Sequence, residues 1–430
     1  MSSHDKLAIL GGKPIISEEF AQYTSIKSAD KSAALEVLNS KKLSEFIGSS
    51  GDYFLGGRKV RELESYWSNY FQVDNSISVN SWTSGLWVAI GALGLDPGSE
   101  VIVSSWTMAA TATTILHWNL IPVFADIDEG TFNLNPIDVE SRITKRTRAI
   151  VSPDIFGQSA DIESLQVICK KYDLKLVSDS AQSPGATRNG YFAGTGSDIG
   201  GFSLNYHKHI QSGEGGVAVT NSPELAYRMQ LLRNHGEVVV GQNAELENQY
   251  GIMGMNMRLG EIESAIAASQ LGVLSEAIET RRSGAQLFSK LISELRGVSI
   301  PEILPGNDHV YYVFGMKFDC SQIGVNRTTL VTALKAEGVP AIQEGYQNIH
   351  KLPLFAKELT YRKNALPYSL LPSRRRRELS TTELPIAERL HGTNFVGINW
   401  CAKEFTITEV ELLGAAFQKV WRNLDSLRDS

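Results

Sequence analysis

Short apolar runs alternate with longer helical stretches from about residue 75 to residue 220, and this alternation limits the folds open to the chain. Parallel strands that are covered by helices on both faces read as continuous apolar runs. Such runs, separated by helical stretches, predict βαβ units and a mostly parallel sheet. The runs are Ile77–Val79, Val101–Ser105, Pro122–Ile127, Ala149–Phe156, Leu174–Ser180, GGFSL at 200–204 and GGVAVT at 215–220.

A long helical pattern, Glu261–Leu295, comes next, and beyond it the composition changes to a second α/β region. That region begins with the apolar run His309–Phe318, which predicts a strand. The domain boundary is therefore expected near residue 280, inside the long helix. This division gives a large domain of residues 1–280 and a small C-terminal domain of residues 281–430.

Four consecutive arginines lie in the segment Tyr368–Glu378. A run of like charges is most often solvated, so we expect a surface loop here. Contact with a polyanion is the alternative interpretation.

Composition excludes several classes of protein. The chain has 430 residues and a formal net charge of −6. It therefore lacks the excess of basic residues that is typical of a general nucleic-acid binder. Its three cysteines lie far apart without a CxxC pair, so we expect reduced thiols and a cytoplasmic location. The first fifteen residues lack signal-peptide anatomy, and no apolar stretch is long enough to span a membrane.

Two apparent motifs, a dinucleotide fingerprint and a metal-binding histidine pair, are not supported by the sequence around them. GTGSDIG at 194–200 resembles a dinucleotide fingerprint, but its spacing is wrong and it precedes a strand instead of following one. His207 and His209 would point the same way on an extended backbone and could form half of a metal site. Because no third ligand is close in sequence, we expect packing or hydrogen-bonding histidines and no metal.

The informative stretch is residues 178–216, together with one upstream turn. An apolar run ends in Asp179, and Gln182 follows three residues later; Ser203 stands five residues before Lys208. In open α/β sheets ligands bind at the carboxyl ends of the strands, which is where Asp179 is expected. The polar turn NSWTSG at 80–85 opens a helix, and the free N–H groups of its first turn can bind an anion.

Pyridoxal 5′-phosphate needs all of these groups together. It requires a lysine amine for its aldehyde, a carboxylate beside its pyridine nitrogen, and hydroxyls and helix-terminal amides for its phosphate. Protonation of the pyridine nitrogen makes the ring an electron sink. Each residue alone is weak evidence, because a lone lysine is usually a surface charge and a lone aspartate is often a helix cap. Their joint occurrence in this order favours the cofactor.

The chain resembles the sugar aminotransferases of fold-type I, the StrS/DegT-like family, from about Leu7 to its C-terminus. The resemblance implies a large domain with a mostly parallel seven-stranded sheet flanked by helices, a smaller C-terminal α/β domain, and an N-terminal arm that packs on the small domain. The matching segments are GGRKVRELE, VNSWTSGL, LDPGSEVIVSSWT, PVFADID, ITKRTRAI, FGQSADI, SDSAQSPGA, the Lys208 region with GEGG, LRNHGE and GMNMRLGEIESAIA.

The resemblance implies a role for each matched residue. Lys208 forms the internal aldimine and is the acid and base of the proton shift. Asp179 pairs with the pyridine nitrogen, and Gln182 donates to the ring hydroxyl. Trp106 takes the place of the aromatic residue that stacks on the pyridine face.

Three further residues, Thr83, Ser84 and Ser203, lie where the family binds the phosphate. Asn256 matches a residue that the neighbouring subunit supplies to that phosphate. The resemblance therefore implies a homodimer with shared active sites.

The implied reaction is a ping-pong transamination. Glutamate or glutamine gives its amino group to the cofactor, leaving pyridoxamine phosphate, which then aminates a nucleotide-linked keto-sugar or a cyclitol in amino-sugar or polysaccharide biosynthesis. One branch of the fold, a pyridoxamine-phosphate-dependent dehydratase or lyase, replaces the lysine with histidine, and Lys208 argues against that alternative. A non-enzymatic regulatory relative is the second alternative. Asp154 departs from the family, in which a histidine often stands before the FGQ-like segment.

Overall fold

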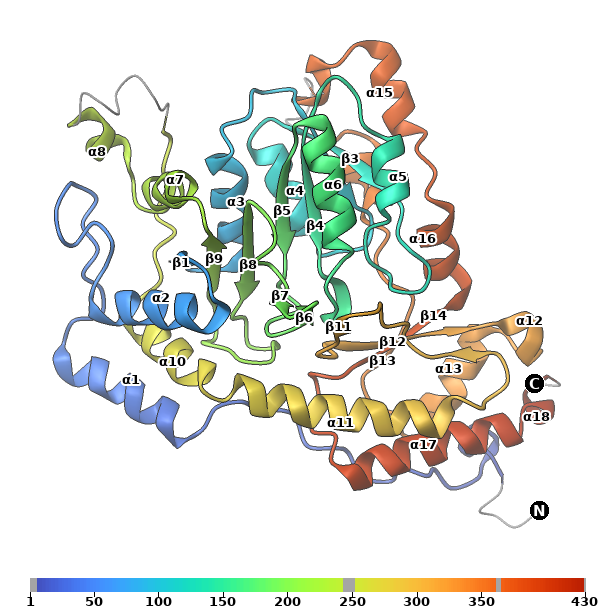
Figure 1. The fold of residues 1–430 in the computed structure, drawn as a ribbon. Helices are drawn as coiled ribbons and strands as arrows, with labels where there is room; N and C mark the ends of the chain where they lie inside the picture. The colour runs from blue at the N-terminus through green and yellow to red at the C-terminus, as the bar shows by residue number, and fades with distance from the viewer. Residues whose placement is uncertain (1–5, 243–251, 361–364, 429–430) are drawn as a thin grey trace.

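The computed structural model describes residues 6–242, 252–360 and 365–428. Its centre is a seven-stranded sheet within this described part, in the order β1-β9-β8-β5-β4-β2-β3 (Figure 1). Neighbours from β8 to β3 run parallel, whereas β9 is antiparallel to both β8 and β1. The predicted mostly parallel sheet is therefore confirmed. Its strands are β1 (Asn75–Val79), β2 (Glu100–Ser104), β3 (Ile121–Ala125), β4 (Thr147–Pro153), β5 (Lys175–Asp179), β8 (Ile199–Ser203) and β9 (Gly216–Thr220).

Helices cover both faces of this sheet, which explains why most residues of its strands are buried and why each strand contains an apolar run. Alternate residues of a strand point to opposite faces. In β2, Val101 and Val103 pack in the cluster beneath α3, α4 and α7, whereas Ile102 packs in the cluster beneath α5 and α6. Helices α2 and α10 cover the β8–β9 end. These helices are α2 (Arg58–Phe71), α3 (Trp82–Ala92), α4 (Ala109–His117), α5 (Pro136–Ser141), α6 (Ile162–Tyr172), α7 (Pro223–Arg233) and α10 (Glu261–Leu271).

A smaller antiparallel sheet, in the order β10-β12-β14-β13, packs with three helices around a separate core. Its strands are β10 (Val298–Ser299), β12 (Val313–Phe318), β13 (Ile342–Glu344) and β14 (Phe395–Asn399), and the helices are α11 (Leu274–Ile292), α13 (Arg327–Ala336) and α17 (Ile407–Arg422). A third sheet joins β6 (Thr187–Arg188), β7 (Tyr191–Phe192) and β11 (Asn307–Asp308).

The single long helix expected over Glu261–Leu295 is two helices. Helix α10 ends before Gly272, and α11 begins at Leu274. Glycine is a poor helix former, so Gly272 favours the interruption, although Gly284 is accommodated inside α11. Leu274 packs in a core with the large sheet, whereas Phe288 packs with the small sheet. The predicted division at residue 280 stays a prediction, since α11 contributes residues to both cores.

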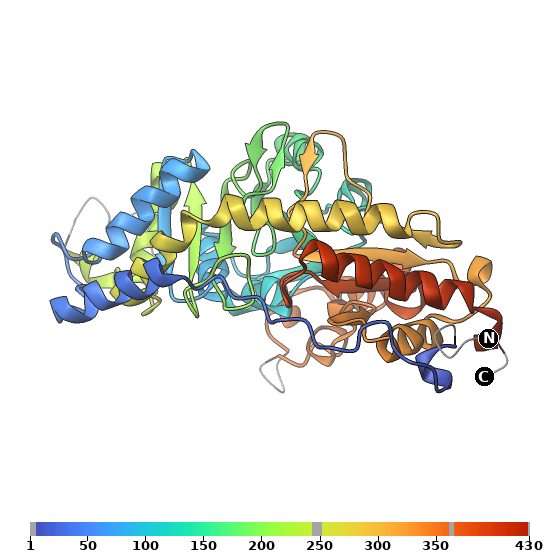
Figure 2. The same cartoon turned by 90° about the horizontal axis from the view of Figure 1, so that it is seen from below.

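An N-terminal arm, residues 7–27, runs along the small sheet's helices before it reaches α1 (Ser28–Ser40), as Figure 2 shows. Its apolar residues Leu7 and Ile16 lie in the core of the small sheet. The N–H groups of Ala8 and Ile15 donate to the two carboxylate oxygens of the buried Glu337, at 2.8 and 3.1 Å. The arm is thus held by a carboxylate as well as by apolar packing.

The arginine run lies at the surface as expected, with none of its residues buried, but it forms a helix, α15 (Ser373–Ser380), and the expectation of a loop is wrong. Arg375 donates to both oxygens of the fully buried Glu100, at 2.7 and 2.9 Å. Arg376 pairs with Glu358. Two of the four charges therefore anchor the helix, because a buried carboxylate needs a partner of opposite charge.

The remaining helices connect these elements. They are α8 (Glu237–Gly241), α12 (Cys320–Ile323), α14 (Pro353–Ala356), α16 (Pro385–Arg389) and α18 (Asp425–Arg428). None of the helices in the described residues combines the length and the apolar character that crossing a bilayer requires. The first five residues, which belong to the segment expected to lack a signal peptide, lie outside the described residues.

Candidate active site

A cavity of about 290 Å³ lies at the carboxyl ends of β5 and β8, beside the first turn of α3. Strand β5 ends at Asp179, strand β8 ends at Ser203, and α3 follows β1 after a short polar turn. The cavity brings together five of the eight residues predicted from the sequence: Thr83, Asp179, Gln182, Ser203 and Lys208.

Asp179 is held by a hydrogen bond to each of its carboxylate oxygens. The Trp82 indole Nε1–H donates to Oδ1 at 2.7 Å, and the Thr111 hydroxyl donates to Oδ2 at 2.6 Å. The Ala181 N–H adds a longer contact to Oδ1, at 3.3 Å. An ionised carboxylate can accept about four hydrogen bonds, so capacity remains for one more donor in the cavity.

Glycines make the room that Trp82 occupies. A Cβ at Gly201 would lie 1.9 Å from the indole ring, and one at Gly85 would lie 2.4 Å from it. At Gly216 a Cβ would lie 2.7 Å from the backbone nitrogen of Trp82. Only residues without a side chain permit this approach. The start of α3 therefore sits directly against strands β8 and β9.

Lys208 also lines the cavity and is buried, with 7% of its surface exposed. Burial lowers the pKa of its amine to about 8, although the nearby Asp179 carboxylate acts in the other direction. The ring of Tyr312 forms the surface against which the amine rests. A neutral amine is thus accessible near physiological pH, which a nucleophilic lysine needs.

The two histidines next to Lys208 differ in their surroundings: His207 lines the cavity, whereas His209 does not. His209 is fully buried, and its Nε2 lies 2.9 Å from the backbone carbonyl oxygen of Val310. Burial lowers the pKa of both His207 and His209, the former to about 4. Within residues 6–242, 252–360 and 365–428, no three His, Cys, Asp or Glu side chains gather as a metal ion would require.

Gln182 connects two walls of the cavity. Its Oε1 accepts from the N–H of Phe156 at 2.9 Å, and its Nε2 lies 3.4 Å from the hydroxyl of Tyr346. The amide is therefore fixed in orientation, with Tyr346 beside it on the small-sheet side of the cavity.

The two residues predicted at the first turn of α3, Thr83 and Ser84, differ in whether they line the cavity. Thr83 lines the cavity. Ser84 does not, because its hydroxyl donates to Asn80 Oδ1 at 2.6 Å and its N–H donates to the Ser81 hydroxyl at 3.1 Å. Ser81 caps the helix and also lines the cavity. An anion at this helix start would meet Thr83, Ser81 and the backbone amides of the first turn.

Trp106 is not on the cavity wall, so the stacking role expected for it needs correction. Its side chain is fully buried, its indole N–H donates to Asn348 Oδ1 at 2.7 Å, and it packs edge-to-face on Phe395. Met108, two residues later, lines the cavity and is 67% exposed. Trp106 is the largest aromatic residue of this segment, and its ring packs in the core because burial of its large apolar surface is favourable.

Asn256 lies on the surface and is not among the residues that line the cavity of its own chain. It forms an isolated bridge with Asn234, and its Oδ1 lies 3.5 Å from the backbone nitrogen of Arg258. A role at another subunit's phosphate stays a prediction.

Asp154 also lines the cavity and was noted in the sequence only as a departure. Burial raises the pKa of its carboxyl to about 6. The Ser180 hydroxyl donates to Oδ2 at 2.5 Å, and the Ala160 N–H donates to Oδ1 at 2.8 Å. Trp82, Thr111, Tyr312 and Tyr346 gave no signal of their own in the sequence, because each reaches the site through tertiary packing.

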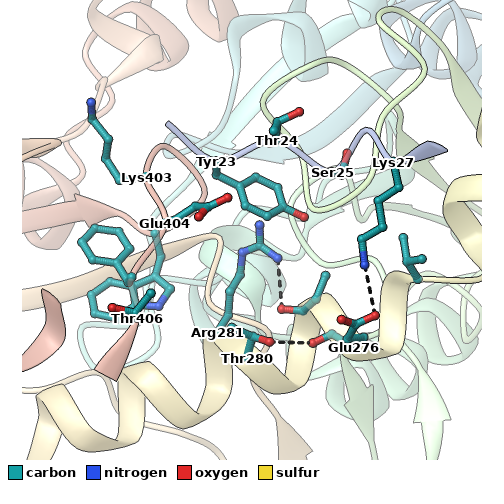
Figure 3. Close-up of a pocket in the computed structure, with 14 residues that line it drawn as sticks. Tyr23, Thr24, Ser25, Lys27, Glu276, Thr280, Arg281, Lys403, Glu404 and Thr406 are labelled. Carbon is teal, nitrogen blue, oxygen red and sulfur yellow. Dashed lines mark hydrogen bonds and ion pairs between the residues drawn. The ribbon is translucent and has the colours of Figure 1, made fainter. Parts of the chain in front are cut away.

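A second cavity, of about 240 Å³, lies between the N-terminal arm, α11 and residues 400–406 (Figure 3). The Arg281 guanidinium lies under the ring of Tyr23, 4.1 Å from its centroid. The Tyr23 hydroxyl donates to the carbonyl oxygen of His209 at 2.9 Å. None of the eight predicted residues lines this cavity, but the arm that borders it braces the loop carrying Lys208.

Comparison with known proteins gives one family. The model of the DegT/DnrJ/EryC1/StrS aminotransferase family matches residues 38–390. A putative L-glutamine:3-amino-2,3-dideoxy-scyllo-inosose aminotransferase of Streptoalloteichus tenebrarius is 30% identical, over 98% of this chain and 99% of its own. An L-glutamine:2-deoxy-scyllo-inosose aminotransferase of the same organism is 32% identical, over 89% and 92%.

Solved structures have the same fold. PseC of Helicobacter pylori, an aminotransferase involved in the biosynthesis of pseudoaminic acid, aligns with a TM-score of 0.78 and 25% identity, covering 94% of this chain and 100% of its own. A GDP-4-keto-6-deoxymannose-3-dehydratase with a trapped PLP–glutamate adduct aligns with a TM-score of 0.75 and 22% identity, over 93% and 100%.

Proposed function

Because the chain belongs to the DegT/DnrJ/EryC1/StrS aminotransferase family, we propose that it transfers the amino group of glutamine or glutamate to a keto-sugar or a keto-cyclitol. Its cofactor is pyridoxal 5′-phosphate. The observation that carries the proposal is the meeting of Lys208 and Asp179 in one cavity. The names of the two relatives, which are L-glutamine:inosose aminotransferases, favour glutamine as donor and a cyclitol as acceptor.

The residues of the cavity fit the cofactor from one end to the other. Asp179 has spare acceptor capacity for the pyridine nitrogen, and Lys208 offers its amine to the aldehyde. The first turn of α3, with Thr83 and with Ser203 opposite, offers hydroxyls and amides to the phosphate. Met108 is the exposed side chain available to cover a face of the ring.

Bound here, the cofactor would supply an electron sink that stabilises negative charge on the substrate carbon next to the nitrogen. Lys208 Nζ would remove the proton from that carbon of the amino donor, and in the second half-reaction it would return a proton to the acceptor's carbon. Burial lowers the pKa of this amine to about 8, so a fraction of it is uncharged near neutral pH. Asp179 would hold the pyridine nitrogen protonated, and Gln182 would orient the ring hydroxyl.

We further propose that the protein acts as a homodimer in the cytoplasm. Asn256 is exposed, and Met253 and Met255 beside it are 70% and 48% exposed, as expected for residues that a second copy covers. In that arrangement Asn256 would reach the partner's phosphate. Cys169 and Cys401, both buried as free thiols, support a reducing compartment.

The alternative reaction is loss of a hydroxyl from a keto-sugar by a lyase that uses pyridoxamine phosphate. The residue type at position 208 disfavours it, because lysine can both bond the aldehyde and return a proton to the substrate carbon. Amination and dehydration also leave different products. A product that gains nitrogen supports the proposal, whereas one that loses a hydroxyl supports the lyase.

The test is the visible absorbance of the purified protein, before and after L-glutamine or L-glutamate is added. We expect a yellow band that depends on Lys208 and that bleaches when the amino donor is added. Lys208→Ala should lack both the lysine-dependent band and turnover. A wild-type protein that gives no band even with added pyridoxal phosphate would overturn the proposed function.

A further inference from the structure

Trp82 lines the candidate active site, although the proposed transamination itself does not need an indole side chain there. We propose that Trp82 is a positioning residue, whose indole N–H holds the Asp179 carboxylate in the orientation that meets the cofactor's pyridine nitrogen. The inference rests on the proposed function, since it assumes that a pyridine ring binds beside Asp179. It assigns to a tryptophan a role that neither the sequence nor the comparisons indicated.

The bond itself is short and enclosed. The indole nitrogen lies 2.7 Å from Asp179 Oδ1, and the Trp82 side chain is 5% exposed. A hydrogen bond to an ionised acceptor is stronger than one between neutral groups, and more so away from water. Indole is a donor only, so it cannot compete with the carboxylate as an acceptor for the proton on the pyridine nitrogen.

The ring that carries this donor cannot move far. Gly201 and Gly85 leave no space between their α-carbons and the indole, so the ring is confined by backbone on two sides. Rotation of the ring away from Asp179 would drive it into these strands and this helix. A donor on a rigid ring fixes its acceptor more closely than a flexible side chain could.

The position of Trp82 in the chain adds a second consequence. It is the first residue of α3, directly before Thr83, which faces the expected phosphate site. One helical turn thus contacts both ends of the expected cofactor, the phosphate through Thr83 and the pyridine partner through Trp82. The spacing between these ends is set by two adjacent residues and not by two separate loops.

Asp179 has one more restraint, which predicts how large the effect should be. Thr111 donates to Oδ2, and its hydroxyl lies 2.8 Å from that of Thr107. Loss of the indole N–H therefore leaves Oδ1 with only the longer contact from the Ala181 N–H, at 3.3 Å, while Oδ2 keeps its bond from Thr111. We expect Trp82→Phe to lower kcat about tenfold, while KM for the amino donor changes little.

The experiment uses the holoenzyme of three proteins: wild type, Trp82→Phe and Trp67→Phe. Trp67 is a matched control, because its buried indole nitrogen has no hydrogen-bond partner among the described residues. Pyridoxal phosphate labelled with ¹⁵N in its ring reports protonation of the pyridine nitrogen by NMR. We expect the ring-nitrogen signal to move toward the unprotonated value in Trp82→Phe alone. Equal signals and equal kcat in the two variants would overturn the inference.

A second measurement stands even if Trp82→Phe fails to fold. With ¹⁵N-labelled tryptophan, the indole N–H signals of wild type and Asp179→Asn are compared. We expect one indole signal to move, because the charged acceptor of Trp82 becomes neutral; if none moves, the bond is not there. A wild-type protein that binds no pyridoxal phosphate overturns the proposed function and, with it, this role for Trp82.

Discussion

Lys208 lies against the face of Tyr312, with its Nζ 4.4 Å from the centre of the ring. An aromatic face attracts a cation, whereas burial disfavours the charge. The groups that act on this amine come from several elements: Asp179 at the end of β5, Tyr312 before β12, and Cys401 after β14. Burial is the largest of these effects, and the pKa of Lys208 falls from 10.5 to about 8.

This depressed pKa predicts how the stability of the cofactor-free protein depends on pH. Between pH 8 and 10.5 the unfolded chain still holds the proton that folded Lys208 has lost. Stability therefore rises with pH through this window, and below it the fold carries a cost of about 3 kcal/mol. Lys208→Met should be more stable than wild type by about that amount at neutral pH, with the difference shrinking as the pH rises.

Urea unfolding at neutral and alkaline pH measures this difference. Lys170→Met, at an exposed helical lysine, is the control and should leave the free energy of unfolding nearly unchanged at both pH values. A gap between wild type and Lys208→Met that is constant with pH would contradict the buried-amine explanation.

Asp179→Asn tests the partner of the pyridine nitrogen. The amide keeps an acceptor for the Trp82 indole but loses the negative charge, so the ring would be a weaker electron sink. We expect the cofactor to bind and kcat to fall roughly a hundredfold. Steady-state kinetics together with an absorbance titration separates the two effects; unchanged kcat would contradict the role of Asp179.

Met108 and Trp106 offer a direct comparison of two candidate ring contacts. Met108 borders the cavity and Trp106 is buried behind it, so Met108→Ala should weaken binding of pyridoxal phosphate several-fold. Trp106→Phe should leave that affinity unchanged while lowering the melting temperature, because it loses the bond to Asn348. Equilibrium binding of pyridoxal phosphate to the apoprotein of each variant distinguishes the two residues. If Trp106→Phe weakened binding more than Met108→Ala, the stacking role of Trp106 would be supported instead.

Lys419 tests the buried clasp that holds the N-terminal arm. Its amine lies 2.9 Å from Glu337 and 2.7 Å from the carbonyl oxygen of Lys13, and 2% of its surface is exposed. Lys419→Met would leave the Glu337 carboxylate buried without a counter-ion, which costs about 3 kcal/mol. Urea unfolding should register this loss. The double variant with Glu337→Gln should recover part of it, and failure to do so would point to packing as the cause.

The large sheet could be predicted because its strands are buried on both faces and read as apolar runs. Elements fixed by local backbone geometry were harder. The strand expected from His309 begins only at Val313, because Tyr311 has a positive φ of 51° and its N–H donates to His309 Nδ1. The arginine run forms a helix that is anchored to the large sheet, because Arg375 pairs with Glu100, 275 residues away. No local pattern contains that information.

Lys208 and Asp179 could be predicted because a parallel sheet delivers successive strand ends to one edge. Residues that reach the site only through tertiary packing could not be predicted. Trp82 reaches Asp179 only because glycines far along the chain leave space for it, and Trp106 faces the core despite the same strand-end position. Residue order was thus enough to predict that Lys208 and Asp179 meet in one cavity, whereas the contacts that support them depend on tertiary packing.

The close fit of Trp82 against Gly201 also restricts how this protein can evolve. A side chain at position 201 has nowhere to go while the indole is present, since its Cβ would already overlap the ring at 1.9 Å. Shrinking position 82 alone would not make room, because the same Cβ would lie 2.7 Å from the backbone carbonyl oxygen of Val217 in the neighbouring strand. Directed-evolution libraries aimed at this pocket should therefore keep glycine at position 201.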